Sequence, residues 1–242
     1  MTRVLHCWDQ AGIACIIAKW QRKLGHEVQV IKPERNDQFG FLSHYNETKV
    51  DFGGSDFDDF AVDQAYKYDI IHCHSVVEIA STIKTIYPEK KVFIHYHGSD
   101  LRTNPINTYA NSLVDGIFYA TPDLKPYLPS RSVYISTAVD TDMFYHTIIG
   151  KDPFINTDIK NILYKDTPEL YRKYGVFIDK KIVCGKPIPS ISKIGWECMA
   201  LGLKVITFDN RILDQRKLPY THTPEYVTNL LEKSYLNTIN KK

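Results

Sequence analysis

The sequence lacks a long hydrophobic run, a regular set of cysteines and a strong net charge. Its only apolar stretch near the N-terminus, residues 11–18, is flanked by Asp9 and Lys19, whereas a membrane-spanning helix needs about 20 apolar residues. We therefore expect a soluble, cytoplasmic protein with at most peripheral membrane contact. A signal peptide remains an alternative, because its apolar segment can be as short as about 7 residues.

Cysteine content and charge exclude further classes of protein. The five cysteines contain no CxxC pair, which indicates buried thiols of a reducing compartment and neither a zinc finger nor a disulfide framework. Lys and Arg number 30 against 28 acidic residues, a net charge of +2. Nucleic-acid binders need more phosphate-neutralising cations, so no nucleic-acid partner is expected. Gly and Pro, 12 each, are too scarce for a fibrous chain.

Short apolar strands alternate with helical stretches through the first 140 residues. This alternation predicts a parallel sheet with helices on both faces, and hence an α/β fold with a Rossmann-like sheet. The predicted strands are residues 3–7, 28–31, 70–74, 92–96, 116–120 and 133–136, and the predicted helices are residues 12–24, 77–87 and 105–114.

Two regions depart from this alternation. Residues 33–68 are rich in Gly, Asp and aromatic residues and predict a long irregular connection, a type of loop that is often functional. Thr167 and Thr223 each precede a proline, which predicts that their hydroxyls cap the helices that follow. The elements predicted after residue 144 are helices at 168–174, 192–201 and 224–239 and strands at 176–178 and 204–208.

The most specific motif is HYHGSDLR at residues 95–102, directly after the strand at 92–96. Ligands bind at the carboxyl ends of strands in an open parallel sheet. There a glycine lets a ligand approach the backbone, a histidine transfers protons, and Asp100 with Arg102 forms a supporting ion pair. The alternative is a capped turn with a surface ion pair.

Besides residues 95–102, four further segments stand out: DQAG at 9–12 with LGHEV at 24–28, DIIHCH at 69–74, VYISTAVDTDMF at 133–144 and GWECMALGLKVI at 195–206. In their order along the chain, these five segments resemble the family-4 glycosyltransferases of the two-domain GT-B fold. The resemblance is nearly continuous over residues 3–144. It implies a Rossmann-like acceptor domain at 1–144, a reduced second Rossmann-like lobe for a nucleotide-sugar donor at 145–242, and transfer of the sugar to a carbohydrate or other hydroxyl acceptor.

The resemblance also implies roles for individual residues. The expected site consists of the catalytic residues His97, Asp100 and Arg102, the acceptor-binding residues Gly12, Gly98 and Ser99, and the donor-binding residues Glu197, Ser190, Ser192 and Lys193. His97 would lie at the point of transfer, Glu197 would hydrogen-bond the ribose, and Ser190 or Ser192 would cap the helix whose N-terminus holds the diphosphate. The expected partners are a UDP- or GDP-sugar and a glycan, with a homodimer left open. No metal or other cofactor is expected.

The second half departs from the family pattern. Only 242 − 144 = 98 residues follow residue 144, and no Gly-rich strand with Arg and Lys for a diphosphate is found there. Pro189 stands where the family has the first of its two glutamates. A catalytically inactive glycan-binding or partner subunit is therefore kept as the alternative function. Because few strands are predicted after residue 144, we expect residues 145–242 not to fold alone.

Other chemistries have weaker support. The pairs Asp56 with Asp58 and Asp140 with Asp142 could each supply oxygens to Mg²⁺ or Mn²⁺, but acids two residues apart are common in solvated loops. His72 and His74 point the same way on one strand and could share a metal, although core histidines are commoner. A nicotinamide-dependent oxidoreductase would need GxGxxG, and a single glycine follows the first strand.

Overall fold

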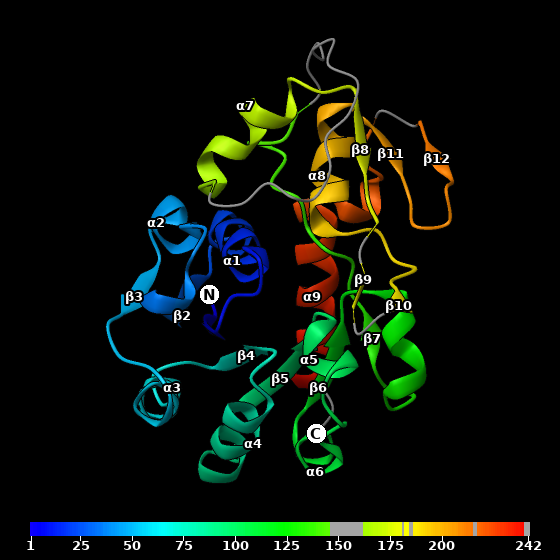
Figure 1. Ribbon diagram of the computed structural model, residues 1–242. Coiled ribbons are helices and arrows are strands. Elements are labelled where there is room, and N and C mark those ends of the chain that lie inside the picture. Colours follow the sequence, from blue (N-terminus) through cyan, green and yellow to red (C-terminus); the bar gives the residue numbers. More distant parts are fainter. Residues whose placement is uncertain (146–161, 181, 184–185, 215–216, 240–242) are drawn as a thin grey trace.

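The computed structural model describes residues 1–145, 162–180, 182–183, 186–214 and 217–239. Figure 1 shows a larger α/β part formed by the first 145 residues and a smaller α/β part above it, with the C-terminal helix running between them. The larger part contains a seven-stranded sheet and the smaller part a three-stranded sheet. The predicted α/β class is therefore confirmed.

The seven-stranded sheet is parallel throughout, in the order β3-β2-β1-β4-β5-β6-β7. The chain extends the sheet from β1 in one direction and then, from β4 onwards, in the other. In open α/β sheets a ligand crevice lies at this reversal, outside the carboxyl ends of the strands. The strands are β1 (Arg3–Cys7), β2 (Glu27–Pro33), β3 (Thr48–Val50), β4 (Ile70–His74), β5 (Lys91–Tyr96), β6 (Gly116–Tyr119) and β7 (Val133–Tyr134).

Alternate residues of the central strands enter two separate hydrophobic cores. Val4, Ile70 and Phe93 share a core with α1 (Ile13–Lys23) and α9 (Pro224–Ile239). Their neighbours in sequence, such as Leu5 and Ile71, share a core with α3 (Ser55–Ala65) and α4 (Val77–Ile86). Both faces of the sheet are thus covered, which explains why its strands are apolar at successive positions.

The predicted irregular connection at residues 33–68 is wrong. It contains a 3₁₀ turn η1 (Glu34–Asn36), a short helix α2 (Phe41–Tyr45), the edge strand β3 and the helix α3. Helix α3 buries Phe57, Ala61 and Ala65, a spacing of four residues that marks one face of a helix. Acidic residues and the glycines before the helix obscure this pattern in the sequence.

Two other predicted elements are shorter than expected. The helix predicted at 105–114 is α6 (Thr108–Leu113), which Asn107 caps by accepting a hydrogen bond from the Ala110 N–H at 2.9 Å. A one-turn helix, α5 (Ser99–Arg102), precedes it, and a 3₁₀ turn, η2 (Pro122–Tyr127), follows β6. The strand predicted at 133–136 ends at Tyr134.

The smaller part is built around a sheet in the order β12-β11-β8, in which β11 and β8 are parallel and β12 is antiparallel. The two predicted strands are present, and β12 and a β9–β10 hairpin are additional. Thr223 caps α9 by accepting from the Tyr226 N–H at 3.4 Å, whereas Thr167 lies within α7 and donates to Tyr164 instead, so its predicted capping role is wrong. The elements are η3 (Tyr164–Asp166), α7 (Thr167–Tyr171), β8 (Val176–Ile178), β9 (Ile182–Val183), β10 (Lys186–Pro187), α8 (Lys193–Leu201), β11 (Lys204–Ile206), β12 (Ile212–Leu213), η4 (Tyr220–His222) and α9.

Helix α9 leaves the smaller part and packs on the larger one, beside α1 (Figure 1). Its Tyr235 is buried against Phe93, with ring centroids 4.7 Å apart. The core on this face continues without interruption from the sheet into α8 and β11. The two parts therefore share the hydrophobic core on the α1 and α9 face of the sheet.

No helix in the described residues is both long and apolar enough to span a bilayer. Four cysteines, Cys7, Cys15, Cys73 and Cys198, are free and buried, as predicted, and Cys184 lies outside the described residues.

Candidate functional site

Unusual backbone conformations gather at the carboxyl edge of the parallel sheet. Trp8 and Ala11 after β1 and Ser75 after β4 have φ angles of 73°, 56° and 65°, and Gly98 after β5 has φ 130°. A positive φ strains a residue with a side chain, and such residues concentrate at functional sites. This edge is where the sequence predicts the acceptor site.

The loop after β1 is held rigidly around a buried aspartate. Asp9 is fully buried and accepts hydrogen bonds from the Gly12 and Ala14 N–H groups, each at 2.8 Å. Burial raises the pKa of Asp9, and the nearby Lys32 ammonium opposes that rise. Gly12 has φ 79°, and a Cβ there would overlap the Phe41 ring. Gly12 thus brings the backbone close to an aromatic side chain.

The loop after β5 is held by Asp100. Its carboxylate accepts hydrogen bonds from the His97 and Gly98 N–H groups at 2.8 and 2.7 Å and from the Ser75 hydroxyl at 2.7 Å. Asp100 therefore fixes the loops after β4 and β5 relative to each other. Ser99, the first residue of α5, is exposed.

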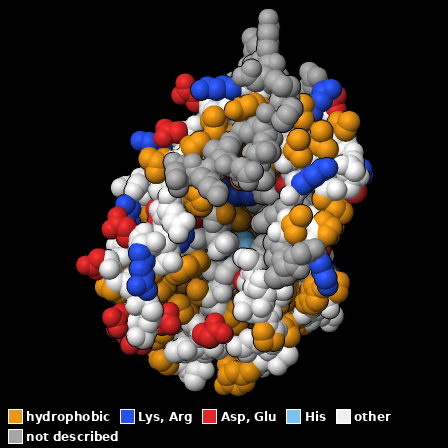
Figure 2. Space-filling view, viewed as in Figure 1, with side chains coloured by type: hydrophobic (Ala, Val, Ile, Leu, Met, Phe, Trp, Pro, Cys, Tyr) orange, Lys and Arg blue, Asp and Glu red, His pale blue; other side chains and the backbone are white. Residues whose placement is uncertain are grey.

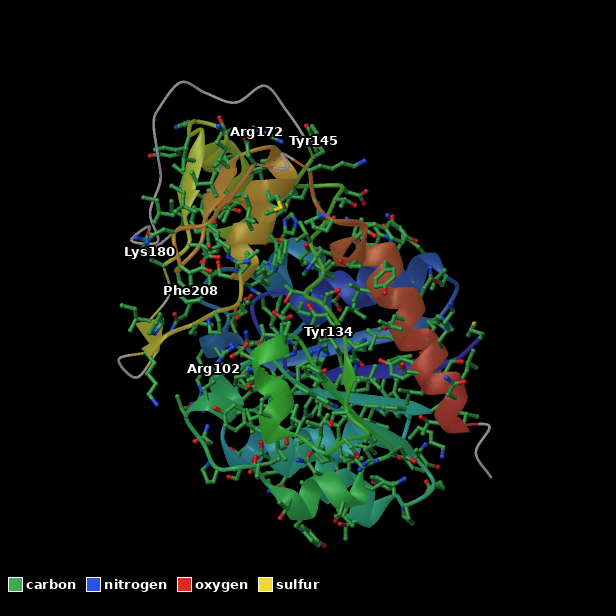
Figure 3. The ribbon with its side chains drawn as sticks, turned by 90° about the vertical axis from the view of Figure 1, so that its right-hand side faces the viewer. Arg102, Tyr134, Tyr145, Arg172, Lys180 and Phe208 are labelled. Atoms are coloured by element: carbon green, nitrogen blue, oxygen red, sulfur yellow. The ribbon has the colours of Figure 1, made fainter. Side chains whose placement is uncertain are left out.

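The expected ion pair between Asp100 and Arg102 is wrong. Arg102 forms two hydrogen bonds to the Asp123 carboxylate, at 2.9 and 3.0 Å, and a third to the Thr121 hydroxyl at 3.0 Å. In Figure 3 Arg102 lies on the larger part, on the same side of the molecule as Lys180 and Phe208 of the smaller part. Arg102 thus links α5 to the turn after β6.

His97 is partly exposed at the end of β5, and its Nε2 lies 2.9 Å from His74 Nδ1. Desolvation lowers the pKa of His97 to about 4, so its ring is neutral at pH 7. His72, His74 and His95 are buried beside it. Sequence reasoning noted the pair on β4 but missed that β1 and β5 add histidines on the same face.

A cavity of about 270 Å³ lies between the two parts of the molecule. Ala11 comes to it from the β1 loop, and Lys193, Ile194 and Glu197 come from the first two turns of α8. Its remaining walls are mainly aromatic. They are Phe39, Phe41, Ile162, Tyr164, Thr167, Tyr171 and Phe177.

Helix α8 brings an ion pair to this cavity. Ser192 caps the helix by accepting from the Gly195 N–H at 3.1 Å, so of the two predicted capping serines it is Ser192 that fills this position, and Ser190 lies two residues before it, half-buried. Lys193 Nζ lies 2.5 Å from Glu197 Oε1, and the Glu197 side chain is only 2% exposed. Burial raises the pKa of Glu197, and Lys193 opposes that rise. Lys193 also lies over the Tyr164 ring, 4.4 Å from its centroid.

The structure therefore brings the predicted donor residues Lys193 and Glu197 into one cavity with the loop that contains Gly12. His97, Asp100 and Arg102 are not among the described residues that line this cavity. They stand together farther along the same edge of the sheet.

A smaller cavity of about 190 Å³ shares the Ala11, Phe39 and Phe41 walls with the first. Its other walls combine an indole ring with polar side chains: Trp8, Asp9, Gln10, Lys32, Asn36, Asp37 and Gln38. Sequence reasoning missed this cavity. The signal in the sequence was Lys32, a lysine next to the apolar residues of the strand β2. The structure leaves this lysine only 6% exposed, and its ammonium donates a hydrogen bond to the Asp9 carbonyl at 2.9 Å.

The acidic pairs considered as metal sites have other environments. Asp140 is buried and accepts from Lys19 Nζ and the Tyr45 hydroxyl, each at 2.9 Å. Asp142 pairs with the same lysine at 2.8 Å. These carboxylates form an ion-pair cluster between α1 and the segment after β7. Asp56 and Asp58 lie in the first turn of α3, where the helix dipole favours acidic residues.

No protein-family model matches the chain, and no curated protein matches it. Among solved structures it is similar in fold to MurG of Acinetobacter baumannii, with 10% identity, a TM-score of 0.48 and coverage of 100% of this chain and 95% of that chain. It is also similar to S. aureus MnaA in a co-structure with UDP, with 12% identity, a TM-score of 0.47 and coverage of 98% of this chain and 90% of that chain. For the spinosyn forosaminyltransferase SpnP the identity is 13%, the TM-score 0.42, and the coverage 98% of this chain and 93% of that chain. These similarities concern the fold alone.

Proposed function

We propose that the chain is a glycosyltransferase of the GT-B type that transfers a sugar from a UDP- or GDP-sugar to a carbohydrate or other hydroxyl acceptor. The observation that carries this proposal is the cavity between the β1 loop and α8. It joins the carboxyl edge of a parallel sheet, where ligands bind in open α/β proteins, to the N-terminal turns of a helix, where phosphates bind. Residues 1–144 would form the acceptor domain and residues 145–242 the donor lobe.

The donor would bind at α8. The N-terminal turn of this helix, with its partial positive charge, and the Lys193 ammonium would neutralise the diphosphate, with Ser190 and Ser192 beside them. Glu197 would accept hydrogen bonds from the ribose hydroxyls. In the structure Lys193 and Glu197 neutralise each other, so donor binding requires Lys193 to turn from the carboxylate to the phosphates.

The acceptor would bind along the edge formed by the loops after β1 and β5. Gly12, Gly98 and Ser99 would contact it through the backbone, and His97 would stand at the point of transfer. Asp100 holds the His97 backbone in place, and Arg102 is anchored by Asp123. Catalysis would rest on orientation and on stabilisation of the departing diphosphate. Neither a covalent side-chain nucleophile nor a metal at the diphosphate is required by this scheme.

The test combines donor binding with transfer. UDP- and GDP-sugars are screened by thermal shift, because a ligand at 100 times its dissociation constant stabilises a protein by about 2.7 kcal/mol. With the sugar nucleotide that binds, Glu197→Gln should weaken affinity about tenfold to one hundredfold in calorimetry, which corresponds to a charge-assisted hydrogen bond of about 1.5–3 kcal/mol. Glu169→Gln, an exposed acid on α7, is the matched control. Wild-type affinity in the Glu197 variant would remove this residue from the donor site.

His97→Ala should abolish sugar transfer and leave the melting temperature unchanged, because a loop residue at a strand's carboxyl end contributes little packing. Transfer is followed with a radiolabelled sugar. Turnover at the wild-type rate in this variant would contradict the proposed role of His97.

A specific observation favours a second candidate, a glycan-binding subunit without catalysis. Pro189, exposed and just before α8, stands where the related family has an acid. This candidate predicts glycan binding with no response to any nucleotide or nucleotide sugar. The thermal-shift screen separates the two functions.

A further inference from the structure

Five histidines form one cluster on the α1–α9 face of the sheet. The parallel register places His6 of β1 opposite His72 of β4, and His74 of β4 opposite His95 of β5, while His97 follows β5. Neighbouring ring centroids lie between 4.2 and 5.4 Å apart. The first four residues are at most 1% exposed. Nothing in the proposed transfer reaction requires so many buried imidazoles.

Hydrogen bonds that begin at a carboxylate fix the protonated nitrogens in part of this cluster. Gln21 donates its amide N–H to Glu232 at 2.9 Å, so its carbonyl oxygen faces His6 and accepts from Nε2 at 2.8 Å. A neutral His6 then accepts at Nδ1, and His74 must donate from Nε2 at 2.9 Å. His74 Nδ1 is left with a lone pair, to which His97 donates from Nε2 at 2.9 Å. His97 Nδ1 consequently carries a lone pair as well.

Several ring nitrogens of the cluster have no hydrogen-bond partner within the described part of the chain. His97 Nδ1 is buried and has no hydrogen-bond partner there, and neither nitrogen of His95 has one. Burying a polar atom without a partner is costly. His95, with two such atoms at 1% exposure, is the clearest sign that a group outside the protein chain belongs in the cluster.

We propose that His74, His95 and His97 bind one zinc ion, each through an unprotonated ring nitrogen. One nitrogen of each ring lies within 4.8 Å of the other two. Zn–N bonds of about 2.0–2.1 Å in a tetrahedral site place ligand nitrogens about 3.3 Å apart, so the three rings must close around the ion, which replaces the His97 N–H that now bonds to His74 Nδ1. The fixed His74 tautomer is compatible with this role, because a metal-bound histidine usually donates its other N–H to a hydrogen-bond acceptor. His74 donates its Nε2–H to His6, which is connected through Gln21 to the Glu232 carboxylate.

Access favours this group over the second trio, His6 with His72 and His74. All three rings of that trio are fully buried. His97 is partly exposed, and Figure 2 shows histidine surface in the hollow near the centre of the face. A zinc ion held by three histidines there would keep a fourth coordination position for water or an anion. This inference does not rest on the proposed transfer reaction.

The experiment measures metal uptake by the untagged full-length chain. Zn²⁺ affinity is determined by calorimetry, and Co²⁺ is added separately as a spectroscopic probe, because its visible absorption is intense in a tetrahedral site and weak in an octahedral one. We expect one equivalent of Zn²⁺ and a tetrahedral Co²⁺ spectrum. His95→Gln and His97→Ala should each weaken Zn²⁺ binding at least tenfold, and Gln21→Leu, which removes a supporting hydrogen bond, should weaken it about tenfold to one hundredfold.

His44→Gln is the matched control, since His44 is an exposed histidine on α2 outside the cluster. Circular dichroism checks that each variant is folded. If His95→Gln fails to fold, the Zn²⁺ affinity of His97→Ala, a change at a partly exposed residue, provides the test. Absence of Zn²⁺ uptake by the wild type, an octahedral Co²⁺ spectrum, or unchanged affinity in the His97 variant would overturn the proposal.

Discussion

Lys193→Met should destabilise the protein by about 3–5 kcal/mol at pH 7, because it leaves the Glu197 carboxylate buried without its cation. The Glu197 side chain is 2% exposed and the Lys193 side chain 11% exposed, with 2.5 Å between their charged atoms. Methionine keeps an unbranched side chain, and the contacts of the ammonium with the Tyr164 and Phe41 rings are lost together with the charge, so the loss reports mainly on the charge.

A double variant and a change of pH identify the cause. Lys193→Met with Glu197→Gln should recover most of the lost stability, because a neutral amide is cheaper to bury than an unpaired carboxylate. Burial raises the pKa of Glu197 and Lys193 opposes the rise, so the single variant has the more strongly raised pKa. Its folded state then binds a proton that the unfolded chain does not, and its deficit relative to the wild type should shrink as the pH falls from 7 towards 5.

The free energy of unfolding is measured in urea by tryptophan fluorescence at both pH values. Lys165→Met, a change at an exposed lysine, is the control and should stay within about 0.5 kcal/mol of the wild type. A loss below about 1 kcal/mol for Lys193→Met, or a double variant no more stable than the single one, would refute the reasoning that Lys193 offsets the burial of the Glu197 carboxylate.

Three further predictions concern the fold. Gly12→Ala should lower the melting temperature more than Gly25→Ala does. Both residues have a positive φ, but a Cβ at Gly12 would overlap the Phe41 ring, whereas a Cβ at Gly25 would have no atom within 4 Å. Equal losses in the two variants would contradict this reasoning. Burial lowers the pKa of His6 and of His222 to about 4, so the unfolded chain binds more protons than the folded one below pH 6.5. The free energy of unfolding should therefore fall by about 2 kcal/mol per ring between pH 7 and 5. A free energy of unfolding that stays constant over this range in urea titrations would contradict this prediction. Residues 145–242 expressed alone should show no cooperative melt, because α8 and α9 complete their core against the sheet. Residues 1–144 should show one, because they contain the whole seven-stranded sheet and all of its second core. A sharp melt of the C-terminal fragment at low concentration would show an independent domain.

Much of the fold could be predicted from local patterns in the sequence. The strands β1, β4 and β8 have the predicted bounds, because each is a short apolar run that helix-forming or turn-forming residues interrupt at both ends. A cap at Ser190 or Ser192 and the start of α9 at Pro224 could also be predicted, since a cap depends on residues within one turn, and the structure shows that Ser192 is the capping residue. The edge strand β3 and the helices α2 and α3 were missed, because short elements rich in Gly and Asp give a weak periodic signal.

The site depended on contacts between distant residues, which no local pattern specifies. Arg102 pairs with Asp123 in the turn after β6 rather than with Asp100 in its own motif, because the Asp100 carboxylate already accepts four hydrogen bonds, from Ser75, His97, Gly98 and Leu101. By itself the sequence determined the alternation of strands and helices and the residue types at the carboxyl edge of the sheet. Only the tertiary structure decided that Ala11 and Glu197 share a cavity and that histidines of three strands meet on one face, since strand order and register bring these residues together.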